Sequence, residues 1–184
     1  MEAFLISTAL VALAEMGDKT QLLAFVLATR LKRRAAIILG ILVATLANHF
    51  MAGWVGTWLA TLASPQTLRW IVALAFFGFG IWALVPDKLD TAREYSSGSA
   101  FGTTVVAFFF VEMGDKTQLA TVALAARFET LVPVVAGTTL GMMLADVPAV
   151  WLGDVLAERI NLKITRWIAA GLFIALGAAT LLFV

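Results

Sequence analysis

The sequence of 184 residues contains no cysteine and a single histidine, and only 14% of its residues are charged. Without cysteine the chain can form no disulfide, no thiolate metal site and no thiol nucleophile. The lone histidine, His49, cannot build an imidazole metal site, and we expect it to be a hydrogen-bonded packing residue. The net charge of +1 provides no basic excess of the kind that binds nucleic acid.

What the chain has in abundance is apolar residues. Hydrophobic residues make up 61% of the sequence and the mean hydropathy is +0.95, well above an ordinary soluble domain. A membrane-spanning helix needs about 20 mostly apolar residues. Six candidate spans follow, at residues 3–29, 35–63, 70–85, 100–126, 131–153 and 167–184. The first residues lack the basic region of a cleavable signal, so we expect the first span to be retained.

The chain also repeats itself. The octet Glu-Met-Gly-Asp-Lys-Thr-Gln-Leu occurs at residues 15–22 and again, 97 positions later, at residues 112–119. The same shift aligns Arg-Trp-Ile at 69–71 with Arg-Trp-Ile at 166–168. Such self-similarity at a fixed distance indicates one structural unit used twice.

The repeat predicts the fold class. Because each copy holds an odd number of spans, the second copy must enter the bilayer from the opposite side. We therefore expect an all-α integral membrane protein with six transmembrane helices in two inverted three-helix repeats. The first repeat would cover residues 1–86 and the second residues 100–184, joined by a cytoplasmic linker at residues 87–99.

Lysine and arginine set the orientation, because they accumulate in cytoplasmic loops. One side of the predicted bundle carries nine of them: Arg30, Lys32, Arg33, Arg34, Lys88, Arg93, Arg159, Lys163 and Arg166. The other side carries only Arg69 and Arg127. Both termini should therefore lie outside the cytoplasm.

The repeated octets place charge deep in the predicted spans, with Glu15 and Glu112 near the bilayer midplane. An ionised residue there costs about 2.5 to 3.5 kcal/mol, which points to function. On a continuous helix, positions i, i+3 and i+4 share a face. We therefore expect two inward-facing sets, Glu15 with Asp18 and Lys19, and Glu112 with Asp115 and Lys116. Four carboxylates and two lysines leave a net charge near minus two, which a divalent cation matches.

Neighbouring polar residues narrow the choice of metal. The amide oxygens of Gln21 and Gln118 and the hydroxyls of Thr20 and Thr117 would add hard ligands, which suit magnesium, calcium or manganese rather than copper or zinc. We expect Asn48 and Asp146 to face the same cavity. Gly17 and Gly114 would allow close helix approach or local unwinding. Lys19 and Lys116 would neutralise the acids when no cation is bound.

Other functions remain open from the residues alone. The acidic sets could be internal Glu-Lys pairs that only hold helices together. A small-solute exporter of the amino-acid type would share the architecture, and a cation channel could use the same carboxylates. An intramembrane enzyme lacks an evident serine, cysteine or histidine pairing. With no ATP-binding glycine loop in the sequence, a transporter would be driven by a gradient, and mutually repelling carboxylates would bind protons and release them to the metal.

The two octets resemble the signatures Glu-x-Gly-Asp-Lys/Arg-Thr/Ser of a family of small cation transporters found in bacteria, thylakoids and the Golgi. Both signatures match, at Glu15 to Thr20 and at Glu112 to Thr117. The resemblance implies a six-helix secondary transporter, not an enzyme, with no cofactor. It would move Mn²⁺, in some members Ca²⁺, in exchange for protons, with Glu15, Asp18, Glu112 and Asp115 as the cation site.

The short central linker lacks the long acidic loop of eukaryotic members of this family. It favours a bacterial protein of the inner membrane, where the resemblance implies manganese export. Because six helices are few to enclose a cavity, a homodimer is a further expectation.

Overall fold

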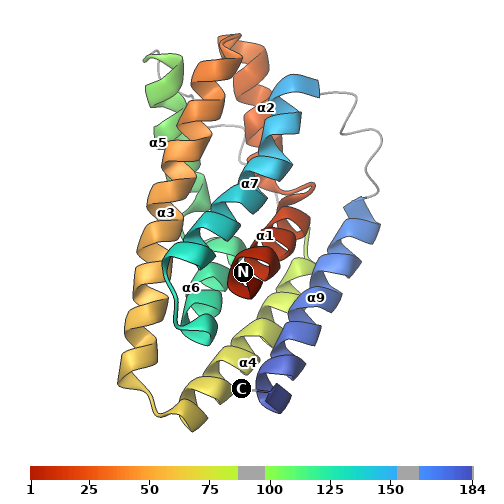
Figure 1. Ribbon diagram of the computed structural model, residues 1–184. Helices are drawn as coiled ribbons and strands as arrows, with labels where there is room; N and C mark the ends of the chain where they lie inside the picture. The colour runs from red at the N-terminus through yellow and green to blue at the C-terminus, as the bar shows by residue number, and fades with distance from the viewer. Residues whose placement is uncertain (87–97, 153–161, 184) are drawn as a thin grey trace.

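The computed structural model describes residues 1–86, 98–152 and 162–183, and it is entirely helical in these ranges (Figure 1). The described residues form eight helices and no strand. The helices are α1 (Glu2–Glu15), α2 (Lys19–Leu31), α3 (Arg34–Leu62), α4 (Pro65–Ala83), α5 (Ala100–Glu112), α6 (Lys116–Phe128), α7 (Val132–Leu152) and α9 (Leu162–Phe183).

Four of the described helices are long and apolar enough to cross a membrane: α3, α4, α7 and most of α9. They correspond to four of the six predicted spans. The start of α4 lies five residues before the prediction, because Ser64 caps this helix by accepting a hydrogen bond from the Thr67 backbone N–H at 3.2 Å. Most of the predicted linker, residues 87–97, lies outside the described residues.

The other two predicted spans, 3–29 and 100–126, are each broken in two. The chain leaves the helix after Glu15 and starts the next helix at Lys19, and it does the same between Glu112 and Lys116. The prediction that Glu15, Asp18 and Lys19 share one helix face is therefore wrong, and so is its counterpart in the second octet. The acid that ends one helix and the lysine that begins the next belong to different elements.

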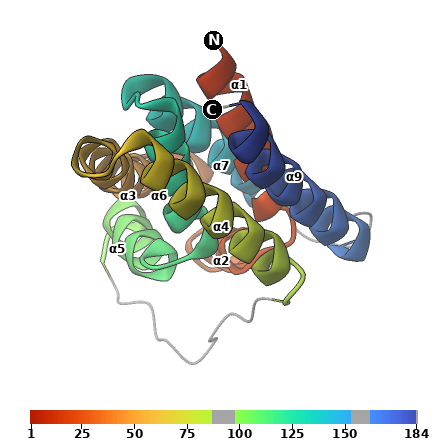
Figure 2. The same ribbon diagram turned by 90° about the horizontal axis from the view of Figure 1, so that it is seen from below.

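Several contacts between helices are reciprocal under the shift of 97 positions. Helices α4 and α9 lie side by side (Figures 1 and 2). A Cβ on Gly80 would lie 3.1 Å from the Ala170 carbonyl oxygen, and a Cβ on Gly177 would lie 3.1 Å from the Ala73 carbonyl oxygen. The two glycines and the two alanines are each 97 positions apart. The crossing thus has the self-complementary form of a twofold interface.

The long helices α3 and α7 show the same exchange of partners. Helix α3 packs against α5 and α6, whereas α7 packs against α1 and α2. Gly40 of α3 faces Thr104 of α5, and Gly137 of α7 faces Ser7 of α1, again 97 positions apart on both sides. Each half of the chain therefore builds its broken helix against the long helix of the other half.

The buried apolar residues form two cores. The first core joins residues of α1, α4, α6 and α9 with Val134, and its large members include Leu10, Phe76, Leu124 and Phe173. The second core joins residues of α2, α3, α5 and α7. Each broken helix contributes one half to each core, so the breaks lie where the two cores meet.

Candidate cation site

The first helix break is a type II β-turn over Glu15-Met16-Gly17-Asp18. Met16 has φ −62° and ψ 113°, and Gly17 has φ +79°. The Asp18 backbone N–H donates to the Glu15 carbonyl oxygen at 3.0 Å, which closes the turn. A type II turn needs a positive φ at its third residue, where glycine carries no steric cost. The Glu-x-Gly-Asp pattern therefore encodes a turn, not a helix.

The second break repeats this geometry closely. Met113 has φ −63° and ψ 119°, Gly114 has φ +78°, and the Asp115 N–H donates to the Glu112 carbonyl oxygen at 3.0 Å. Local unwinding at the two glycines, which the sequence offered as one of two roles, is confirmed.

Each octet also restarts its helix. Asp18 occupies the N-cap of α2, and its carboxylate accepts from the Lys19 backbone N–H at 2.6 Å. The Gln21 amide oxygen accepts from the Gly17 backbone N–H at 2.9 Å, much as the glutamine of a capping box does. Gln118 braces Gly114 in the same way at 2.6 Å. The two amide oxygens that were predicted as ligands thus hold the turns in this conformation.

The lysines pair across the two octets. The Lys19 Nζ lies 2.6 Å from the Asp115 Oδ1, and the Lys116 ammonium pairs with the Asp18 carboxylate. The Asp18 and Asp115 side chains are almost fully buried, and Lys116 is buried with them. The expected charge balance exists, but it links one repeat to the other. These two ion pairs reach the aspartate of the other octet rather than the glutamate of the same octet.

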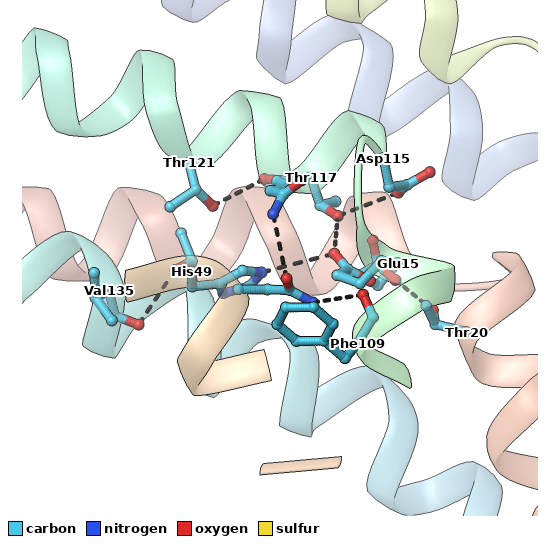
Figure 3. Close-up of polar contacts among 12 residues, drawn as sticks. Glu15, Thr20, His49, Phe109, Asp115, Thr117, Thr121 and Val135 are labelled. Atoms are coloured by element: carbon cyan, nitrogen blue, oxygen red, sulfur yellow. Dashed lines mark hydrogen bonds and ion pairs between the residues drawn. The ribbon is translucent and has the colours of Figure 1, made fainter. Parts of the chain in front are cut away.

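Three carboxylates converge between the breaks. One oxygen from each of Glu15, Glu112 and Asp115 lies within 4.8 Å of the others, and all three residues are buried. The Thr20 hydroxyl donates to the Glu15 Oε2 at 2.5 Å, and the Thr117 hydroxyl donates to the Glu112 Oε1 at 2.7 Å (Figure 3). Both threonines therefore orient the glutamates. Asp18 is not in this group of three.

Several carboxylate oxygens in this region have no hydrogen-bond donor among the described residues. They are the Glu15 Oε1, the Glu112 Oε2 and both side-chain oxygens of Asp146. Asp146 lies on α7, is fully buried, and interacts electrostatically with Glu15, Glu112 and Asp18. That Asp146 and Asn48 face one cavity stays a prediction. Buried carboxylate oxygens without donors are costly unless a cation or a proton satisfies them.

Asn48 lies on α3 beside the second break. Its amide nitrogen donates to the Phe109 carbonyl oxygen at 3.0 Å, and its amide oxygen lies 3.3 Å from the Gln118 Nε2. At the first break, the Gln21 Nε2 donates instead to the Ala145 carbonyl oxygen at 2.9 Å. Asn48 therefore supports the turn that carries Glu112.

His49 lies beside the acids, a position that the sequence did not lead us to expect. Both ring nitrogens lack a hydrogen-bond partner among the described residues, and the Nε2 lies 3.7 Å from the Glu112 Oε1 (Figure 3). His49 is fully buried, as expected of a packing residue, but the expected hydrogen bond is absent among the described residues. The available signal was its alignment with Asp146 under the shift of 97 positions, because residues at equivalent positions of two repeats face equivalent glutamates.

This arrangement suits a hard cation. Ligands on opposite sides of Ca²⁺ are ~5 Å apart, since each lies at about 2.3 to 2.6 Å. The Glu15, Glu112 and Asp115 oxygens lie within 4.8 Å of one another, close enough to contact one such ion together. A site made only of oxygen ligands suits magnesium, calcium and manganese.

Comparison with known proteins agrees with this chemistry. The family model described as "Divalent cation/proton antiporter GDT1" matches residues 3–91 and 100–183. The chain is 45% identical over 184 residues to a protein of Vibrio cholerae serotype O1 named "Putative manganese exporter", covering 100% of this chain and 92% of that protein.

Two more distant relatives match nearly end to end. The chain is 30% identical to "GDT1-like protein sll0615" of Synechocystis, covering 94% of this chain and 93% of that protein. It is 29% identical to "GDT1-like protein 5" of Arabidopsis thaliana, covering 99% and 96%. No solved structure matches the chain. The resemblance in the two octets is confirmed, and the expectation of a membrane transporter rather than an enzyme is confirmed with it: the chain belongs to the GDT1 family of divalent cation/proton antiporters.

Proposed function

We propose that this protein exports Mn²⁺ across the bacterial inner membrane in exchange for protons, by alternating exposure of one buried site. The observation that carries the proposal is the meeting of the Glu15, Glu112 and Asp115 carboxylates between two helix breaks of an apolar chain. Carboxylates at such depth are expensive to bury, and transporters place their ion sites at broken helices of this kind. The relative named as a manganese exporter supports the choice of cation.

The same acids would serve both ions. Glu15, Glu112 and Asp115 would hold the cation, with Asp18 and Asp146 close by and Thr20 and Thr117 orienting the glutamates. Carboxylates this close repel one another when all are ionised, so protons stabilise the set in the absence of metal. A divalent cation would displace those protons. Coupling of metal efflux to proton entry follows from this competition.

The crossed lysine pairs would complete the exchange. Lys19 and Lys116 neutralise Asp115 and Asp18 when no cation is bound, so the empty site does not leave uncompensated buried charge. A cation that binds Asp115 must compete with the Lys19 ammonium. The lysines thereby keep the site from holding its cargo too tightly to release it.

We further propose that the chain is an inverted repeat of six spans, with α1 and α2 forming one span and α5 and α6 another. The reciprocal approaches of Gly80 to Ala170 and of Gly177 to Ala73, together with the two crossed lysine-aspartate pairs, support a twofold relation between the described parts of the two repeats. The lysine and arginine distribution favours termini outside the cytoplasm. Labelling of a cysteine added at either end, from outside intact cells, tests that orientation.

The central test is Mn²⁺ flux into proteoliposomes under a pH gradient. Glu15→Gln and Asp115→Asn should each abolish flux, because each removes a charge from the three-carboxylate group. Glu129→Gln, which removes an exposed acid at the end of α6, is the matched control and should transport normally. Normal flux in both site variants would exclude these acids as the cation site.

The same assay separates the remaining functions. Competition of Mn²⁺ flux by Ca²⁺ measures preference between the two ions. Proton movement that accompanies metal flux, and disappears without it, identifies exchange, whereas a channel would conduct Mn²⁺ without a pH dependence. Inhibition by amino acids would instead favour a small-solute exporter.

A further inference from the structure

The packing of α4 and α9 breaks the reciprocity that the rest of the chain obeys. Helix α4 packs against α6, and α9 packs against α1. Under the shift of 97 positions, the equivalent contacts would join α9 to α2 and α4 to α5. No contact of comparable extent joins either pair in the described residues.

The two cores show the same imbalance. The first core contains Val72 and Phe76 of α4 and Ala170 and Phe173 of α9. The second core, between α2, α3, α5 and α7, contains no described residue of α4 or α9. In Figure 1, α4 and α9 lie toward the lower end of the molecule, away from α2 and α5 at the upper end. The α4/α9 pair therefore covers only one half of the broken helices.

Equivalent residues of the two breaks differ in exposure accordingly. Met113 is 49% exposed and Gly114 is exposed, whereas Met16 and Gly17 are partly buried. Non-helical backbone at membrane depth is tolerated only where protein covers it or water reaches it. The exposed turn at Gly114 is therefore expected to face water rather than lipid.

The equivalent arginines at the outer ends of the broken helices follow the same pattern. Arg127, at the end of α6, is partly buried and lines a cavity with Arg69 of α4. Arg30, its counterpart at the end of α2, is exposed. Helices α4 and α9 thus cover the end of the molecule that α1 and α6 form, but not the end that α2 and α5 form.

We propose that α4 and α9 form a mobile unit that switches between two related packings, of which this structure holds one. In the other packing, α4 lies on α5 and α9 lies on α2. The α4–α9 crossing is itself twofold, so it survives the switch unchanged while only its contacts with the broken helices exchange. The inference rests on the proposed alternating exposure. In the predicted orientation, the present packing closes the outer side and opens the acids to the cytoplasm.

Absence of native cysteine makes this testable by pairwise cross-linking in the full-length protein. Val72 of α4 and Ala123 of α6 both belong to the first core and line one groove. Their counterparts under the shift are Ala169 of α9 and Val26 of α2. Val72→Cys with Ala123→Cys should cross-link with a short bismaleimide in the present packing, and Val26→Cys with Ala169→Cys only in the other.

The control pair is Phe76→Cys with Phe173→Cys. These residues are each other's counterparts, and their rings lie 6.4 Å apart between centroids. They should cross-link equally in both packings. Cross-links are read on gels after proteolysis at a site inserted in the central linker, so that linked halves stay together, and they require no transport measurement.

We expect Mn²⁺ and a pH gradient to raise the Val26/Ala169 cross-link several-fold at the expense of the Val72/Ala123 cross-link. Locking either pair with a reducible reagent should lower Mn²⁺ flux more than tenfold, with recovery on reduction. If gel filtration shows that the Val26/Ala169 variant does not fold, the pair Ala73→Cys with Val111→Cys tests the contact between α4 and α5 instead.

Absence of both alternative cross-links in variants that transport Mn²⁺ would overturn the inference, as would normal flux through a protein locked at Val72/Ala123. Alternative cross-links in a protein that moves no Mn²⁺ would instead overturn the proposed substrate and leave the two packings standing.

Discussion

The glycine of each turn allows a test of whether the helix breaks depend on a positive φ. Gly114 has φ +78°, and a Cβ built on it would meet no atom within 4 Å. Gly114→Ala therefore introduces no clash, and its whole cost is the backbone strain of a non-glycine residue at positive φ. That strain is about 1 to 2 kcal/mol. A change of 1 kcal/mol moves the melting temperature of a protein of this size by about 2 to 4 °C, so we expect a loss of about 2 to 8 °C.

The matched control is Gly171→Ala. Gly171 lies inside α9, and a Cβ there also meets no atom within 4 Å, but its φ is not positive. Replacing a helical glycine by alanine should stabilise the protein by about 0.5 to 1 kcal/mol. Gly114→Asn should lower the stability less than Gly114→Ala does, because asparagine is enriched at positive φ.

The assay is thermal unfolding in detergent followed by tryptophan fluorescence, for which the chain offers six tryptophans. Mn²⁺ flux in the same variants tests whether the turn also positions Glu112. The reasoning would be refuted if Gly114→Ala matched Gly171→Ala in stability, because the turn would then not depend on positive φ.

Three further predictions concern residues that join the two repeats. Lys116→Gln should lower stability by about 3 to 5 kcal/mol, because it removes the ammonium that pairs with the buried Asp18 carboxylate. Saturating Mn²⁺ should restore part of the loss in the same unfolding assay. Gly56→Ala should lower stability by about 1 to 3 kcal/mol, because its Cβ would lie 2.2 Å from the Val122 carbonyl oxygen. Unchanged stability would show that α3 and α6 separate easily. Asn48→Ala should cost about 1 to 3 kcal/mol and reduce Mn²⁺ flux, because it removes the two hydrogen bonds that join α3 to the Phe109 carbonyl oxygen and the Gln118 amide at the second break. Unchanged flux would mean that this break needs no such support.

Much of the site could be read from residue types and spacing. The octets identified Glu15, Asp18, Glu112 and Asp115 as the acids, and the structure brings three of them together. Their helical-face arrangement was wrong, because Gly17 was weighed as an optional unwinding point rather than as the third residue of a type II turn. The Glu-x-Gly-Asp spacing, with a cap-forming aspartate directly after the glycine, was the available signal.

The partners of the lysines could not be read in the same way. Lys19 lies next to Asp18 in sequence, yet its ammonium reaches Asp115. Each lysine reaches across the site to the aspartate of the other repeat, which only the packing of the two turns against each other makes possible. The position of His49 could not be read from the sequence for the same reason, because only the packing of α3 against the second break brings it near Glu112.

The amino-acid sequence by itself determined that the chain is apolar and duplicated, where its charges fall, and where its helices must break, because hydropathy, a fixed shift of 97 positions and a glycine at a turn are local properties. Only the tertiary structure decided which lysine neutralises which aspartate, which carboxylates share a centre, and which half of the broken helices α4 and α9 cover. Two equivalent halves allow two equivalent packings, and the balance between them depends on contacts between residues that are distant in the chain.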